Sequence, residues 1–160
     1  MYIFIMRHGD AAVDSISDAT RELTPRGWQE SQKMAHWLSQ QSPDIDCVLV
    51  SPYIRAEQTL KVVRENLTLS DSEQVLNELM PSGDVALVAS YLQVLATQGH
   101  KAVLVVSHLP LVGYLVSELV SGQIPPMFAT SSIACVELDH KTEKGRLLWQ
   151  TSPAQLAAKT

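Results

Sequence analysis

Two histidines and two arginines in this chain have the chemistry needed to bind and transfer a phosphoryl group. They are Arg7, His8, Arg55 and His108. His8 suits a covalent nucleophile, because a neutral imidazole attacks phosphorus near neutral pH with little activation. Arg7 and Arg55 suit a clamp on the phosphate oxygens, since guanidinium forks match phosphate geometry and keep their charge. His108, once protonated by a neighbouring phosphate, would add a donor for charge on the equatorial oxygens.

The segments before these side chains explain why we expect them to meet. Apolar runs over residues 1–6, 45–50 and 102–106 have the pattern of buried strands. Each run leads directly, or through a short turn, to one or two of the four side chains. The carboxyl ends of parallel strands share one edge of an open α/β sheet, where such folds bind ligands. We therefore predict one anion site, in which the second ring nitrogen of His8 donates to a backbone carbonyl.

Helical patterns alternate with these strands along the chain. The expected helices begin at Thr24-Pro25, near residue 53, at Asp84 and near Pro110. Further strands are expected over 73–76, 132–139 and 145–151, the last two as a hairpin. This order predicts an α/β three-layer sandwich, with a mainly parallel central sheet, helices on both faces and antiparallel C-terminal strands. Residues 1–152 are expected to form a single domain, and residues 153–160 a flexible tail.

The composition is that of an ordinary globular protein and argues against several functions. The chain has 160 residues, 46% hydrophobic and 18% charged, which is enough for one domain with a sizeable core. We expect no membrane span and no signal peptide, because Arg7 and His8 interrupt the first apolar run. The net charge of -5 disfavours nucleic-acid binding. Cys47 and Cys135 are expected to be buried thiols of a cytoplasmic protein, and the composition predicts a monomer.

Four ordered blocks of sequence carry a resemblance to a known family. They are Arg7-His8-Gly9, residues 23–29, residues 51–59 and residues 106–108. Together they resemble the histidine phosphatase superfamily, which has the phosphoglycerate-mutase-like fold. The compact length and the form of the blocks are most similar to the SixA-type phosphohistidine phosphatases of bacteria.

The resemblance implies a role for each of the four side chains. His8 would be the nucleophile, Arg7 and Arg55 the phosphate-pocket arginines, and His108 the phosphate-pocket histidine. It implies no metal and no other cofactor. The implied reaction is hydrolysis of phosphohistidine on a signalling or phosphocarrier protein, such as a histidine-containing phosphotransfer domain, through a covalent phospho-His8 intermediate.

Two departures from many relatives bear on the substrate. Only residues 78–83 separate the third strand from the next helix, so the long insertion that covers the pocket elsewhere is missing. Glu78 is the candidate general acid, and an exposed loop carboxylate is the alternative interpretation. A weakly placed acid would matter less for phosphohistidine than for a phosphate ester, because imidazole leaves readily from phosphorus. Arg21, in the polar loop 10–23, is a candidate substrate contact or a surface charge. The same two interpretations apply to Asp18, for which a surface charge is favoured.

Two other functions remain open from the sequence. One is a small-molecule phosphomonoester phosphatase or mutase of the same superfamily, which would need a working acid at Glu78. The other is a non-catalytic phosphoprotein-binding module, which would bind phosphate without a phosphoenzyme. The presence of His8 beside the arginines argues against the binding module, because a pure binder needs no nucleophile.

Overall fold

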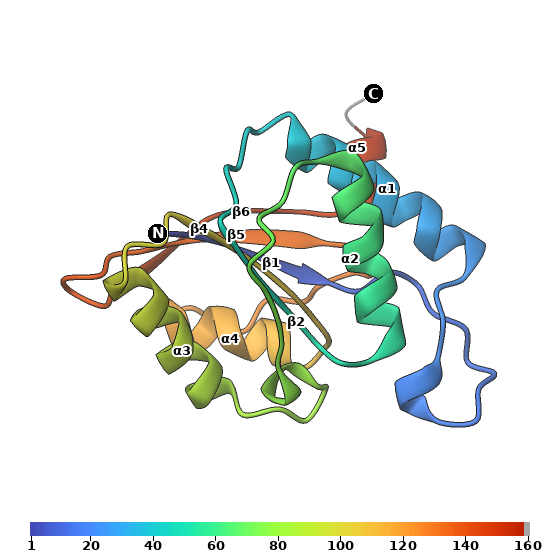
Figure 1. The fold of residues 1–160 in the computed structure, drawn as a ribbon, viewed down its shortest axis with the longest axis horizontal. Helices are drawn as coiled ribbons and strands as arrows, with labels where there is room; N and C mark the ends of the chain where they lie inside the picture. Colours follow the sequence, from blue (N-terminus) through green and yellow to red (C-terminus); the bar gives the residue numbers. More distant parts are fainter. Residues whose placement is uncertain (159–160) are drawn as a thin grey trace.

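A single mixed sheet with helices on both faces forms the body of the protein. The computed structural model describes residues 1–158 (Figure 1). The strands are β1 (Tyr2–Arg7), β2 (Cys47–Val50), β3 (Glu73–Val75), β4 (Ala102–Ser107), β5 (Ile133–Leu138) and β6 (Gly145–Thr151). The helices are α1 (Pro25–Ser39), α2 (Ile54–Asn66), α3 (Val85–Thr97), α4 (Leu111–Leu119) and α5 (Pro153–Ala158), with 3-10 turns η1 (Asp18–Thr20) and η2 (Asn77–Leu79).

The strand order is β3-β2-β4-β1-β5-β6, and the pairing direction follows the connections. Strands β1 to β4, which are joined through helices, pair in parallel, whereas the β5–β6 hairpin is antiparallel. The register places Arg7 opposite Ser107 and Val50 opposite Val106, so three carboxyl ends lie at one edge. The predicted α/β sandwich with antiparallel C-terminal strands is confirmed.

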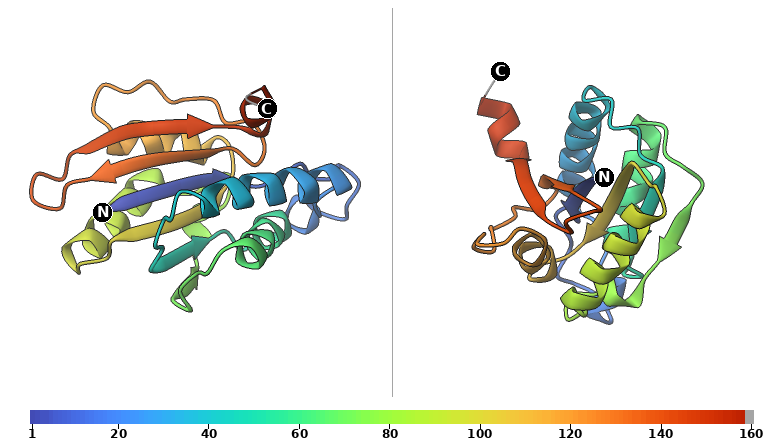
Figure 2. Two further views of the ribbon diagram at one scale, coloured as in Figure 1. Left: turned by 90° about the horizontal axis from the view of Figure 1, so that it is seen from above. Right: turned by 90° about the vertical axis from the view of Figure 1, so that its left-hand side faces the viewer.

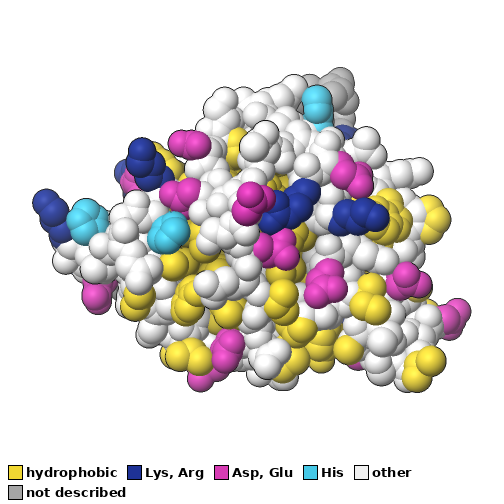
Figure 3. All heavy atoms as spheres, in the orientation of Figure 1, with side chains coloured by type: hydrophobic (Ala, Val, Ile, Leu, Met, Phe, Trp, Pro, Cys, Tyr) yellow, Lys and Arg dark blue, Asp and Glu magenta, His cyan; other side chains and the backbone are white. Residues whose placement is uncertain are grey.

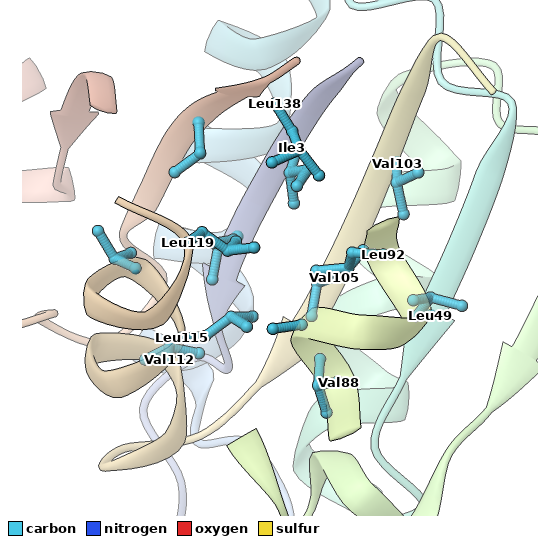
Figure 4. Close-up of a cluster of buried hydrophobic side chains, with 14 of the residues drawn as sticks. Ile3, Leu49, Val88, Leu92, Val103, Val105, Val112, Leu115, Leu119 and Leu138 are labelled. Carbon is cyan, nitrogen blue, oxygen red and sulfur yellow. The ribbon is translucent and has the colours of Figure 1, made fainter. Parts of the chain in front are cut away.

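Two apolar layers hold the helices against the sheet. Helices α1, α2 and α5 cover one face, and α3 and α4 cover the other (Figure 2). The second layer is drawn in Figure 4, where Val88 and Leu92 of α3 and Leu115 of α4 face the strands. Strand β4 is buried at every position, because it has a helix layer on each side. This is why its sequence is continuously apolar rather than alternating.

Polar caps start two of the helices as their sequences predict. The Thr24 hydroxyl accepts the Gly27 N–H at 3.0 Å, and Pro25 fills the first helical position of α1. The Asp84 carboxylate accepts the Leu87 N–H at 3.1 Å at the start of α3. These two caps fix the residues at which the preceding loops end and helices α1 and α3 begin.

The end of the chain differs from the expected flexible tail. Residues Pro153–Ala158 form α5, and Leu156 is only 8% exposed within the apolar layer that includes α1 and α2. The small and polar residues of this segment give no local sign of the contact made by Leu156, because that contact depends on the position of α1. Residues 159–160, the end of the predicted tail, lie outside the described residues.

The surface in the Figure 1 orientation carries both signs of charge. Lys and Arg side chains lie among Asp and Glu side chains on this face, and hydrophobic side chains gather along its lower part (Figure 3). Within residues 1–158, every helix is too short or too polar to cross a membrane.

Candidate active site

The carboxyl ends of β1, β4 and β2 bring two histidines and a serine together. The His8 N–H donates to the Ser107 carbonyl at 2.9 Å, and the Ser51 N–H donates to the Val106 carbonyl at 3.1 Å. The rings of His8 and His108 lie 5.0 Å apart between centroids. Strands β1 and β2 each make one further backbone hydrogen bond to β4 beyond their last residue. The residues that make these bonds, His8 and Ser51, place their side chains at the same edge of the sheet.

The hydrogen bonds of His8 define its tautomer. Its Nδ1 lies 2.7 Å from the Gly9 carbonyl oxygen, which can only accept, so Nδ1 carries the hydrogen. The other nitrogen, Nε2, is therefore unprotonated, and its lone pair accepts a long hydrogen bond from Arg55 Nε at 3.4 Å. Burial, with the nearby charges of Arg55, Arg7 and Arg21, lowers the pKa of His8 to about 4. At neutral pH the ring is uncharged, and Nε2 is available for attack.

Close packing behind His8 explains the glycine that follows it. A Cβ on Gly9 would lie 2.6 Å from Ser31 Oγ and 2.9 Å from the Gly27 carbonyl. The Gly9 N–H donates to Thr59 Oγ1 at 3.0 Å, and that hydroxyl donates to the Arg55 carbonyl at 2.7 Å. The backbone after His8 is thus fastened to α1 and α2, which fixes its distance from Arg55.

Arg55 is a buried cation on the first turn of α2. It is 3% exposed, and its guanidinium lies 5.1 Å from the centre of the Tyr53 ring. Its Nη1 donates to the Asp18 carbonyl at 2.6 Å, and its Nη2 to the Asp18 carboxylate at 3.2 Å. Partial desolvation raises the pKa of Asp18, but hydrogen bonds from Arg21 and Arg55 outweigh it and lower the pKa.

Arg7 is the last residue of β1 and directly precedes His8 in the chain. Its Nη1 donates to the Phe128 carbonyl at 2.8 Å, across 121 positions of sequence. Its Nε is buried and has no hydrogen-bond partner among residues 1–158. Burial and the neighbouring Arg55 charge lower the pKa of Arg7, an effect that an arriving anion would reverse.

His108 is neutral in the ligand-free protein. It is 1% exposed, and burial, with the neighbouring His8 and Arg55, lowers its pKa to about 3. Its Nε2 lies 2.7 Å from Ser51 Oγ, whereas Nδ1 is buried without a partner in the described part of the chain. The cationic state considered from the sequence therefore requires a bound phosphate to raise this pKa.

The two weaker sequence candidates have different surroundings. Arg21 donates to the carbonyls of Ala12 and Ala11, at 2.8 and 3.4 Å, and pairs with Asp18 at 3.1 Å. It is thereby joined to Arg55 through Asp18, at the edge of the site. Glu78 is half-buried in η2, and its carboxylate has no hydrogen bond or ion pair with residues 1–158.

Sequence reasoning underestimated two residues. Ser51 was not singled out as a site residue from the sequence, but its hydroxyl contacts His108 and accepts the Tyr53 N–H at 3.2 Å. Asp18 was interpreted mainly as a surface charge, but it occupies the Arg55 fork. The position of Ser51 at a strand end was the one signal available. The contact of Asp18 depends on how the loop 10–23 folds back, which no local pattern indicates.

Comparison with known proteins agrees with this arrangement. A sequence model of the histidine phosphatase superfamily (branch 1) matches residues 3–79. The phosphohistidine phosphatase SixA of Escherichia coli (strain K12) is 56% identical over 156 residues, which cover 98% of this chain and 96% of the relative. The chain belongs to the histidine phosphatase superfamily.

Further relatives extend the likeness. A SixA homolog of Haemophilus influenzae (strain ATCC 51907 / DSM 11121 / KW20 / Rd) is 40% identical, with 96% of this chain and 97% of the relative covered. A solved structure of the protein histidine phosphatase SixA complexed with tungstate superimposes with a TM-score of 0.95. It is 56% identical, and the match covers 98% of this chain and 99% of the other.

Proposed function

We propose that this chain is a protein phosphohistidine phosphatase that works through a covalent phospho-His8 intermediate. The observation that carries the proposal is the unprotonated Nε2 of His8 beside the buried Arg55. The 56% identity to a phosphohistidine phosphatase supports the reaction class. That a relative of the same identity holds tungstate, an oxyanion, supports phosphate as the group bound here.

In the first step, His8 Nε2 attacks the phosphorus of the substrate phosphohistidine in line. A bond from phosphorus to Nε2 forms as the bond from phosphorus to the substrate imidazole breaks. The leaving ring nitrogen takes up a proton from solvent, which is easy near neutral pH. The Gly9 carbonyl holds Nδ1–H and stabilises the cationic ring that forms on His8.

Arg7, Arg55 and His108 act on the transferring group. The guanidinium of Arg55 donates toward Nε2 and would bind equatorial oxygens, and the Arg7 guanidinium would add a second cation for them. Since the site is buried, these charges stabilise the transition state more strongly than they would in water. Arg21 is proposed to contact the phosphoprotein or the phosphate from the rim.

In the second step, water attacks the phosphorus of phospho-His8. The bond to Nε2 breaks, inorganic phosphate leaves, and a proton passes to solvent. Because the surroundings hold the pKa of His8 to about 4, the released ring returns to its neutral, nucleophilic form. No group other than water is consumed.

We further propose the setting in which this reaction takes place. The substrate would be a signalling or phosphorelay protein, such as a histidine-containing phosphotransfer domain, or a phosphocarrier protein, and hydrolysis would lower phosphate flux through it. A cytoplasmic location is supported by Cys47 and Cys135, which are free, buried thiols. The enzyme is expected to act as a monomer, which light scattering at working concentration would test.

Substrate comparison tests the proposal against its main rival. Initial rates would be measured on a phosphohistidine protein, on a sugar phosphate and on phosphoglycerate, with wild type and Glu78→Gln. We expect a kcat/KM at least 100-fold higher for the phosphoprotein and little change in Glu78→Gln. Preference for a small ester, with a large loss in Glu78→Gln, would instead assign a small-molecule phosphatase or mutase. Binding of the phosphoprotein without turnover would assign a binding module.

A further inference from the structure

The contacts of His108 raise a question about its proton. The ring has two nitrogens, and only Nε2 has a protein partner, the Ser51 hydroxyl at 2.7 Å. That hydroxyl is fully buried and also lies 3.2 Å from the Tyr53 N–H, which can only donate. One acceptor position of Ser51 is therefore already taken by the backbone.

Two arrangements of hydrogen fit these positions. In the first, the Ser51 O–H donates to His108 Nε2, and the hydrogen of the neutral ring is on Nδ1. In the second, Nε2–H donates to Ser51, whose own O–H then has no acceptor among residues 1–158. The second arrangement leaves two buried groups unsatisfied, the hydroxyl hydrogen and the Nδ1 lone pair, whereas the first leaves only Nδ1–H.

The chemistry of the pocket favours the same arrangement. The charges of Arg55 and Arg7 act on both histidines, which marks the pair as a place for an anion. A lone pair on Nδ1 would repel the oxygens of a phosphoryl group, whereas an N–H would donate to them. The charged and titratable groups around His108 are His8, Arg55, Arg7 and Asp18, together with Tyr53, whose ring centroid lies 5.1 Å from that of His108.

We propose that Ser51 is a positioning residue that holds His108 as the Nδ1–H tautomer, so that this histidine donates to the phosphoryl group without first becoming a cation. The proposal deepens the proposed function and rests on it for its catalytic meaning. The two site histidines then share one tautomer but use opposite nitrogens. His8 is fixed by a backbone carbonyl and has its lone pair on Nε2, whereas His108 is fixed by a hydroxyl and has its hydrogen on the buried, unpartnered Nδ1.

The neighbouring strand provides a matched control. Ser107 is also fully buried at a strand end and directly precedes His108, but its hydroxyl donates to the Leu79 carbonyl at 2.6 Å. Ser107→Ala removes a buried hydroxyl of the same size without touching His108 Nε2. Ser51→Thr keeps the hydroxyl and serves as the conservative variant.

The test reads the tautomer directly, by nitrogen NMR of the histidine-labelled, ligand-free protein at pH 7. We expect wild-type His108 to show a protonated Nδ1 and an unprotonated Nε2, a pattern that Ser107→Ala and Ser51→Thr retain. Ser51→Ala should show a mixture of tautomers. Its affinity for tungstate and its kcat/KM on a phosphohistidine protein should each fall about 10-fold.

Several outcomes would overturn the inference. A protonated Nε2, or a ring protonated on both nitrogens, in the wild type would do so without any variant having to fold. So would an unchanged tautomer in Ser51→Ala, or an equal change in Ser107→Ala. The predicted tautomer and tungstate loss in a protein that turns over no phosphohistidine would instead refute the proposed function and leave the assignment of Ser51 standing.

Discussion

The two ends of the sheet differ in what they bury. At the amino ends of the strands lies a cavity of about 790 Å³, bordered by Tyr2, Phe4 and Trp149. At the carboxyl ends, His8, Arg55 and His108 are each less than 7% exposed. The ring of Trp149 also packs edge-on against that of Trp37, with 4.9 Å between ring centroids, so aromatic side chains contribute to the packing near this end. Buried ionisable side chains, rather than the size of a cavity, distinguish the end that can do chemistry.

The largest expected contrast is between two arginines at opposite ends. Arg55→Ala should lower kcat/KM on a phosphohistidine protein by about 10³-fold, because it removes the buried cation nearest His8 Nε2. Arg146→Ala is the control. Arg146, on β6, is 73% exposed and pairs with Glu137, so its loss should change kcat/KM less than twofold. Equal effects in steady-state assays would remove the distinction between the two ends.

The buried histidines predict a pH dependence of stability. Burial lowers the pKa of His8 to about 4, below the unfolded value of about 6.5. Between these values the unfolded chain binds a proton that the folded chain does not. The free energy of unfolding should therefore fall as pH decreases through this window, on the order of 3 kcal/mol for His8.

Denaturant titrations at several pH values would measure this slope. His108, whose pKa is lowered to about 3, acts in the same direction and steepens it. Substituting either histidine by alanine should lower the slope of the free energy of unfolding against pH by the equivalent of about one bound proton. A stability that stays constant between pH 6.5 and 4.5 in the wild type would contradict the neutral, buried state of both rings.

Two glycines, one at each end of the sheet, give the smallest expected contrast in the free energy of unfolding. Their substitutions should nevertheless differ in their effect on kcat/KM. Gly9→Ala should lower the free energy of unfolding by about 1–3 kcal/mol, because the new Cβ would collide with Ser31 and Gly27. It should also lower kcat/KM by displacing His8. Gly99→Ala, at a φ of +92° in open space, should cost about 1 kcal/mol and leave kcat/KM unchanged. Activity loss in Gly99→Ala would contradict this separation.

The strand pattern allowed the meeting of His8, Arg55 and His108 at one edge of the sheet to be predicted from the sequence. Two apolar runs that end in His8 and His108 are enough to predict that these side chains meet, because parallel strands align their carboxyl ends at one edge. The contacts of Arg7 with Phe128 and of Arg55 with Asp18 were not predictable, since they join segments whose meeting depends on loop paths. The state of His108 follows from burial, which a sequence does not specify.

The same reasoning applies to the fold. Helices with a cap, such as those at Thr24 and Asp84, were predictable because start signals are local. Helix α5 was not, since Leu156 is stabilised by the layer over α1 rather than by its own neighbours in sequence. Long-range apolar contact can order a segment whose composition alone favours a frayed end.

Trapping of the phosphoenzyme tests the central claim most directly. Radiolabelled phosphohistidine protein would be mixed with wild type and with His8→Ala, quenched within milliseconds and separated. We expect an acid-labile, alkali-stable label that appears on the wild type, turns over and is absent from the variant. Prompt phosphate release by both proteins would remove His8 from the role of nucleophile and contradict the account.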